Sequence, residues 1–178
     1  MNINDFDKSL DNAMFIARVD NTFVMLYTSI MFGDLSRVDH KVSDKVMEKY
    51  RGFVDDLNSR NLRQMYDELN VKSTNIDSIN YDESGNIIVH VTLVSRYMDY
   101  LMDKETGDII SGISDHRVEH VNKLTFFKRA DAKSLGAARQ CQNCGANMDI
   151  NNSGKCSHCG SIFNMEDYDY VLVDIEVL

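Results

Sequence analysis

Hydrophobic residues recur at helical spacing through the first part of the chain. From Asp5 to Phe32 they fall every three or four positions, and this pattern predicts a long helix with one buried stripe. Gly33 follows the last apolar residue and is a typical helix stop, because glycine readily adopts the left-handed conformation that ends many helices. We therefore expect the chain to open with a helix that packs against a core.

The same spacing predicts two more helical segments. A second helix is expected from Ser43 or Asp44 to Leu57. After a break at residues 58–61 the helical spacing continues, and we interpret the next stretch as a last helical piece. Its apolar residues are Leu62, Met65, Tyr66 and Leu69.

After Val71 the hydrophobic period changes from helical to alternating, which is typical of strands. Helices followed by antiparallel strands predict an α+β fold. The expected strands are Ile76–Tyr81, Ile87–Met102, Arg117–Arg129 and Tyr168–Leu178.

The last expected strand, Tyr168–Leu178, determines the predicted domain organisation. A strand needs a partner, and the nearest upstream candidate is the stretch LTFFKR, residues 124–129. If these two strands pair, everything between them is an insertion at the tip of a hairpin. We therefore expect a main domain made of residues 1–129 plus 167–178, with a linker and a small cysteine-containing module at residues 130–166.

All four cysteines of the chain lie in that insertion, as two Cys-x-x-Cys pairs that are each followed by glycine. Four thiolates at this spacing can surround one zinc ion as a closed tetrahedron, which is the pattern of a structural site. Iron is the alternative metal, because similar pairs also build iron–sulfur centres. Paired disulfides would need an oxidising compartment. The expected ligands are Cys141, Cys144, Cys156 and Cys159.

The residues around the cysteines fit a zinc ribbon. Gly145 and Gly160 allow the backbone to fold back so that N–H groups point at the sulfurs. Residues 151–154 read as a tight turn, and His158 is expected to be an exposed bystander rather than a ligand. The mini-core is so small that we expect it to fold only with metal. It consists of Met148, Ile150, Ile162 and Phe163.

Charge and hydropathy exclude several classes of partner. The chain has 178 residues, 43% of them hydrophobic, and a formal net charge of -9. This charge does not suit binding to nucleic acid or to an anionic membrane surface. The most apolar run, Phe23–Phe32, is about half the ~20 residues that a membrane span needs, so membrane insertion is not expected. With an acidic start and clustered cysteines, the expected compartment is a reducing cytoplasm.

The strand Ile87–Met102 offers one candidate for catalysis. Alternation places Tyr97 and Asp99 on the same face as Val89, Val91 and Leu93, so the two polar residues could line a cavity as an acid/base pair. The simpler interpretation is that Tyr97 forms a hydrogen bond at the rim and Asp99 meets solvent at the strand end.

The spacing of the histidines along the chain does not predict a second metal site. His116 and His120, with Asp115 next to them, have a His-x-x-x-His spacing, but residues four apart on a strand lie ~13 Å from each other. His40 is expected to be a solvated loop residue.

The order of these parts resembles a known family. The stretches FVMLYTSIMFGDL, VHVTLVSRYMDYLMDKETGDIISG and LTFFKR are similar to the domain of the mitochondrial inner-membrane translocase subunit 44 and its bacterial relatives. Some bacterial members carry a C-x-N-C-G-A ribbon before a D-Y-D-[aromatic]-x-L strand, matched here by residues 141–146 and 167–172. The chain departs from the usual knuckle at Gln142 and from an expected tryptophan at Tyr170.

The resemblance implies a cone-shaped fold of the nuclear-transport-factor-2-like class, with helices packed in a curved antiparallel sheet. We expect a non-catalytic binding or scaffold protein with a structural zinc ribbon, which contacts a protein partner or a small apolar ligand. Any contact with a membrane would be peripheral, through that partner. One alternative is an isomerase- or dehydratase-like enzyme that uses Tyr97 and Asp99. The other is iron-based electron transfer or metal sensing at the four cysteines.

Overall fold

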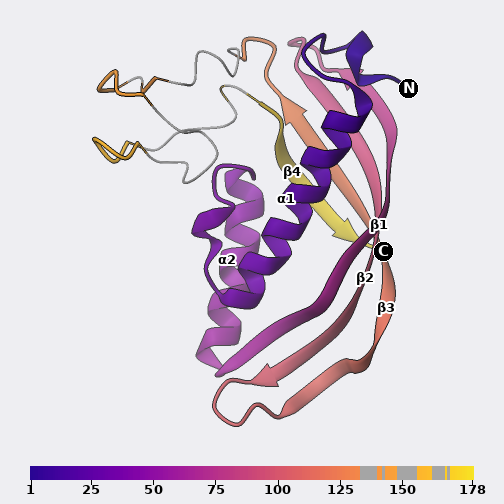
Figure 1. The fold of residues 1–178 in the computed structure, drawn as a ribbon, viewed down its shortest axis with the longest axis vertical. Helices are drawn as coiled ribbons and strands as arrows, with labels where there is room; N and C mark the ends of the chain where they lie inside the picture. The colour runs from indigo at the N-terminus through magenta and orange to yellow at the C-terminus, as the bar shows by residue number, and fades with distance from the viewer. Residues whose placement is uncertain (133–139, 142, 148–155, 162–166, 168) are drawn as a thin grey trace.

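The computed structural model describes residues 1–132, 140–141, 143–147, 156–161, 167 and 169–178. Two α-helices lie on one side of a curved sheet of four antiparallel strands, in the order β1-β2-β3-β4 (Figure 1). The fold class is α+β, as the sequence predicts. The elements are α1 (Asn12–Phe32), α2 (Asp44–Ser59), β1 (Leu62–Tyr81), β2 (Ile87–Asp103), β3 (Ile109–Lys128) and β4 (Val171–Val177), with 3-10 turns at Ile3–Asp5 and Leu35–Arg37.

Helix α1 begins later than the hydrophobic pattern suggests. The Asp11 carboxylate accepts a hydrogen bond from the Met14 N–H at 2.8 Å, so Asp11 caps the helix. The helix expected from Asp5 therefore starts at Asn12, and a separate 3-10 turn at Ile3–Asp5 precedes it. At the other end Gly33 has a φ of +68°, and its N–H bonds back to the Ile30 carbonyl, which confirms the predicted stop.

The predicted last helical piece is wrong, because residues 62–81 form the long strand β1. Leu62 pairs with Asp103 and Tyr81 with Ile87, so β2 provides hydrogen-bond partners along the whole stretch. Tyr66 and Gln64 are both buried, two positions apart, which is the spacing of one strand face. Apolar residues at 62, 65, 66 and 69 fit either period, and the partner strand decides between them.

Strand β3 is longer than predicted because it follows β2 past a large bulge. Between the pairs Tyr97–Val118 and Asp99–Ile113, β3 has five steps where β2 has two. At the next pair Gly112 has a φ of +97°, and a Cβ there would lie 2.3 Å from the Asp99 carbonyl oxygen. Only glycine fits this close approach.

The hydrophobic core lies between the helices and the concave face of the sheet (Figure 1). It is rich in aromatic rings: Phe15 packs edge-on against Phe126 and Tyr170, with ring centroids 5.8 and 5.1 Å apart. Val42 bridges to Leu172 in parallel, which ties the loop before α2 to β4.

Two ion pairs hold the start of β4 and the N-terminal turn in place. Arg18 of α1 binds Asp169, and Lys128 of β3 binds Asp7 at 2.6 Å with both side chains largely buried. Burial alone would raise the pKa of Asp7, but hydrogen bonds from Lys128 and Ser9 outweigh it and hold the pKa at about 2.

Candidate metal centre

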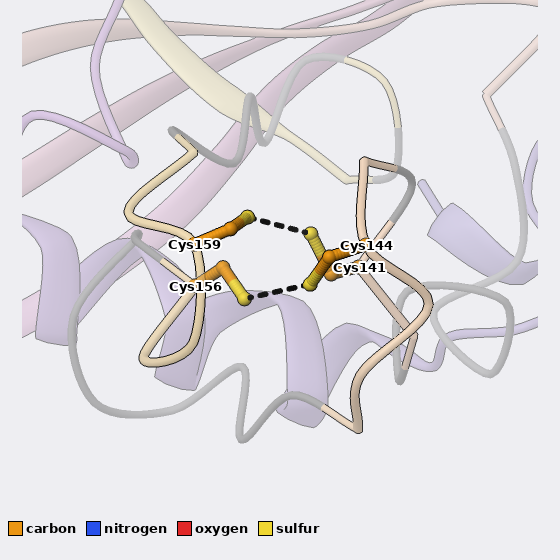
Figure 2. A group of neighbouring side chains, drawn as sticks. All are labelled: Cys141, Cys144, Cys156 and Cys159. Carbon is orange, nitrogen blue, oxygen red and sulfur yellow. Dashed lines mark hydrogen bonds between the residues drawn. The ribbon is translucent and has the colours of Figure 1, made fainter.

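The four cysteines lie in the connection between β3 and β4, the two strands that pair antiparallel at one edge of the sheet. We call the described residues 140–161 the cysteine segment, and α1, α2 and β1–β4 together the body. Figure 2 shows the side chains of two Cys-x-x-Cys turns pointing toward each other across a small gap. The segment stands at one end of the molecule (Figure 1).

The two turns have the same backbone arrangement. In each, the glycine N–H donates to the carbonyl of the first cysteine, and the first cysteine N–H donates to a carbonyl five residues ahead. The bonds are Gly145 N to Cys141 O at 2.8 Å, Gly160 N to Cys156 O at 2.9 Å, Cys141 N to Ala146 O at 2.8 Å and Cys156 N to Ser161 O at 2.9 Å. Repetition of one local geometry in two separate turns indicates a built site rather than a chance cluster.

Gly145 and Gly160 have φ values of +71° and +72°, the left-handed conformation that glycine adopts without strain. This agrees with the role expected for them from the sequence. A Cβ at either position would meet no atom within 4 Å, so the backbone angle rather than crowding favours glycine.

The sulfur positions match a tetrahedral site. Cys141 Sγ lies 3.6 Å from Cys159 Sγ, and Cys144 Sγ lies 3.7 Å from Cys156 Sγ. All four sulfurs lie within 4.8 Å of one another. A tetrahedron with metal–sulfur bonds of ~2.3 Å has edges of ~3.8 Å, so the two short distances are those of ligands to one ion. A disulfide would bring two sulfurs to ~2.05 Å, and all four cysteines are free.

The electrostatics of the four sulfurs also favour a cation. Hydrogen bonds from the Ser161 hydroxyl and N–H, and from the Asn143 amide, lower the pKa of Cys159 to about 5. The Ala146 N–H acts to lower the pKa of Cys144, but desolvation and the three neighbouring sulfurs raise it to about 12. The site therefore favours the thiolate of Cys159 and opposes that of Cys144, and a divalent cation would remove that opposition.

Ser161 is a residue that the sequence reasoning missed. Its Oγ lies 3.1 Å from Cys141 Sγ and 3.0 Å from Cys159 Sγ, so one hydroxyl contacts a sulfur from each turn. The signal was available in the Cys-Gly-Ser order, which places a hydroxyl two positions after the last cysteine. His158 is exposed, as expected. The predicted turn at 151–154 and the mini-core at Met148, Ile150, Ile162 and Phe163 lie outside the described residues.

The structure places Tyr97 in the core. Its ring stacks on His120, with centroids 4.1 Å apart and planes 4° from parallel, and it also packs against Tyr66 at 5.2 Å. Burial, and next the nearby Asp99 carboxylate, raise the pKa of Tyr97 well above its ordinary value.

Asp99 has a separate partner: its carboxylate accepts a hydrogen bond of 2.7 Å from Gln64 of β1. Two hollows are described, of about 540 and 80 Å³, and neither Tyr97 nor Asp99 lines them. The structure thus buries Tyr97 in the core, whereas Asp99 is half-buried and bound by Gln64.

The other histidines lie in different environments. His116 contacts Asp115 at 2.7 Å on the exposed bulge of β3, whereas His120 faces Tyr97. His40 differs from the expectation of a solvated loop residue, because its side chain is largely buried and burial lowers its pKa. Across the described part of the chain, the only group of three or more metal-ligating side chains is the cysteine quartet.

Comparison with known proteins identifies the family of the chain. The model of the Tim44-like domain family matches residues 1–138. The chain belongs to the Tim44-like domain family. The match ends before Cys141, so the cysteine segment and β4 lie beyond the matched residues. Tim44-like domains usually mediate protein–protein interactions, which is consistent with the expected binding or scaffold role.

One solved structure, titled "Crystal structure of intermembrane space region of chloroplast protein ARC6", is similar at 9% sequence identity and a TM-score of 0.41. The similarity covers 90% of this chain and 93% of that one. A search of curated proteins gave no match. Among the described residues, no helix of this Tim44-like protein is long and apolar enough to cross a membrane.

Proposed function

We propose that this Tim44-like protein is a non-catalytic protein-binding module, and that one structural zinc ion holds its cysteine segment together. The observation that carries the proposal is the convergence of four thiol sulfurs from two equivalent turns, in the connection between β3 and β4. The ligands would be Cys141, Cys144, Cys156 and Cys159. In this arrangement residues 130–166 form the linker and ribbon of a domain made of residues 1–129 plus 167–178.

A structural role follows from the ligand set. Four protein thiolates fill the coordination sphere of zinc, so no position is left for a water or a substrate. Thiolates also need a reducing environment to remain free, which supports a cytoplasmic location with any membrane contact made through the partner.

The metal is tested first. Full-length protein purified without added metal should contain one zinc per chain by mass spectrometry and should be colourless. Replacement of zinc by cobalt should give the ligand-field absorption bands of a tetrahedral four-thiolate site. An intense visible absorption with one iron per chain would contradict the assignment of zinc and would support the electron-transfer alternative.

The binding role needs its own experiment. Intact protein and the pair Cys141→Ser with Cys144→Ser serve as bait under chemical crosslinking in cells. We expect a reproducible protein partner with intact bait, and its loss with the variant would place the zinc ribbon in the interface. A protein that captures no partner contradicts the proposal.

A further inference from the structure

A hollow of about 540 Å³ lies between α1 and the connection that follows it, and its lining includes neither a residue of the cysteine segment nor Tyr97. One wall comes from α1 and includes Val24, Met25 and Phe32. The other comes from residues 34–41 and includes Asp34, Arg37 and Lys41. We call this hollow the α1 groove. Its volume is within the range of ~300–1,000 Å³ that is common for ligand sites.

The α1 wall of the groove exposes large apolar side chains. Phe32 is 69% exposed and Val24 is 38% exposed, although the opposite face of the same helix is buried in the core. Phe32 also lines the smaller hollow of about 80 Å³ at the end of α1, so its ring stands between two depressions. Exposed apolar residues that gather beside a hollow are typical of a binding surface rather than of solvated helix.

The other wall carries two cations, Arg37 and Lys41, and one carboxylate, Asp34, so its formal charge is positive. Within the described part of the chain neither Arg37 nor Lys41 forms a close ion pair with a carboxylate, although Arg37 interacts electrostatically with Asp34. Lys41 is half-buried, and this burial lowers its pKa, with Asp169 acting in the opposite direction. Asp34 is the acid of the groove, and its carboxylate accepts a hydrogen bond from the Ser36 N–H.

The groove lining is thus locally cationic in a molecule whose formal net charge is -9. An incoming carboxylate would be repelled by most of the surface and attracted here, and it would stabilise the partly desolvated Lys41 ammonium. Apolar side chains next to that carboxylate would cover Val24 and Phe32.

We propose that the α1 groove binds a peptide segment of a protein partner in which apolar side chains adjoin carboxylates. The inference rests on the proposed binding function and assigns it to one surface. A membrane fits less well, because an anionic lipid surface would repel a chain of this net charge as a whole. The α1 wall also presents polar side chains, which a peptide backbone can satisfy with hydrogen bonds and a lipid tail cannot.

The probe is a displayed library of random peptides of about twelve residues, selected on the full-length, metal-loaded protein. Selected peptides should combine Asp or Glu with Leu, Ile, Phe or Met. Fluorescein-labelled synthetic copies then measure affinity by fluorescence polarisation. Val24→Asp and Arg37→Glu should each weaken binding by about tenfold or more.

Matched controls lie on exposed positions outside the groove. Met14→Asp is on the same helix at a 49% exposed residue, and Arg51→Glu removes an exposed cation of α2. Both should bind the peptide like the unmodified protein. The thermal unfolding midpoint of each variant is measured alongside, so that a variant that does not fold is replaced by Val24→Ser or Arg37→Gln.

Three results would overturn the proposal. The selected peptides could lack carboxylates, or the groove variants and the control variants could lose the same peptide affinity. Vesicles of phosphatidylglycerol could also displace the peptide from the protein. A dimer in sedimentation that Val24→Asp dissociates would assign the groove to a second copy of this chain. If groove variants still crosslink to the cellular partner, the groove assignment fails while the binding function stands. If intact protein has no partner, the binding function itself fails.

Discussion

The body and the cysteine segment are held together by different physics. In the body, two helices and four strands bury a continuous core, so many contacts of modest energy share the stabilisation. In the cysteine segment, two short turns meet through four sulfurs, with hydrogen bonds inside each turn. The body should therefore lose stability by degrees when side chains are trimmed, whereas the cysteine segment should depend on metal in an all-or-none way.

The largest effect is expected from removal of the metal ligands. The double substitution Cys141→Ser with Cys156→Ser takes one sulfur from each turn and should abolish metal binding, since structural zinc contributes roughly 10–16 kcal/mol in small zinc domains. Metal content and limited proteolysis between β3 and β4 measure the loss.

The same variant should keep the main calorimetric transition of the body, because the core does not include the cysteines. If that transition disappears along with the metal, the cysteine segment is an integral part of the fold and the contrast between the two regions is wrong.

The next largest effect is expected in the aromatic core. Phe15 is fully buried between Phe126 and Tyr170, so Phe15→Ala should lower the free energy of unfolding by about 3–5 kcal/mol. Chemical denaturation measures this change, and metal content should stay at one ion per chain. Met14→Ala, one position earlier and exposed, should change stability by less than about 0.5 kcal/mol.

A smaller, pH-dependent effect is expected at the ion pair of Asp7 and Lys128. Asp7→Asn should cost about 1–3 kcal/mol at neutral pH, because it leaves the largely buried Lys128 ammonium without its charged partner.

The sign of the pH dependence follows from the pKa of Asp7, which is about 2 in the folded protein and 3.8 as its ordinary value. The stabilisation is complete above about pH 4 and is lost as the pH falls toward 2. Denaturation curves between pH 6 and 2.5 should therefore converge for the native and Asp7→Asn proteins. A constant difference across that range would contradict the assignment.

The smallest effect is expected from the knuckle glycines. Gly160→Ala places a Cβ on a residue with a φ of +72° and should weaken the cysteine segment by about 1–2 kcal/mol, measured as a higher concentration of chelator needed to remove the metal. Gly52→Ala in α2, where a Cβ meets no atom within 4 Å, should instead leave metal affinity unchanged and slightly stabilise the helix.

Local features of this fold could be read from sequence because neighbouring residues encode them. The stop at Gly33 and the opening at Ser43, whose hydroxyl accepts a hydrogen bond from the Val46 N–H, lie at the predicted positions. The cysteine turns are equally local: each knuckle closes within six residues, and its glycine has the expected positive φ. Metal identity and domain boundaries remain predictions.

The features that could not be predicted depend on contacts between segments that are far apart in the sequence. The hydrophobic pattern of residues 62–69 suits a helix or a strand, and antiparallel pairing with β2 decides for the strand. The bulge that extends β3, the burial of His40 and the engagement of Asp99 by Gln64 likewise depend on segments far apart in the chain.

The sequence by itself determined the stop of α1, the start of α2 and the four sulfur ligands that we propose, because each follows from spacing within one short stretch. The α+β class followed from the order of helical and alternating stretches along the chain. The tertiary structure alone decided that the sulfurs converge, that Tyr97 is packed against His120, and that Val24, Phe32 and two cations border one groove. The physical reason is the same in each case. Distance in space between residues that are far apart in sequence is set by the packing of whole elements, and no local pattern contains it.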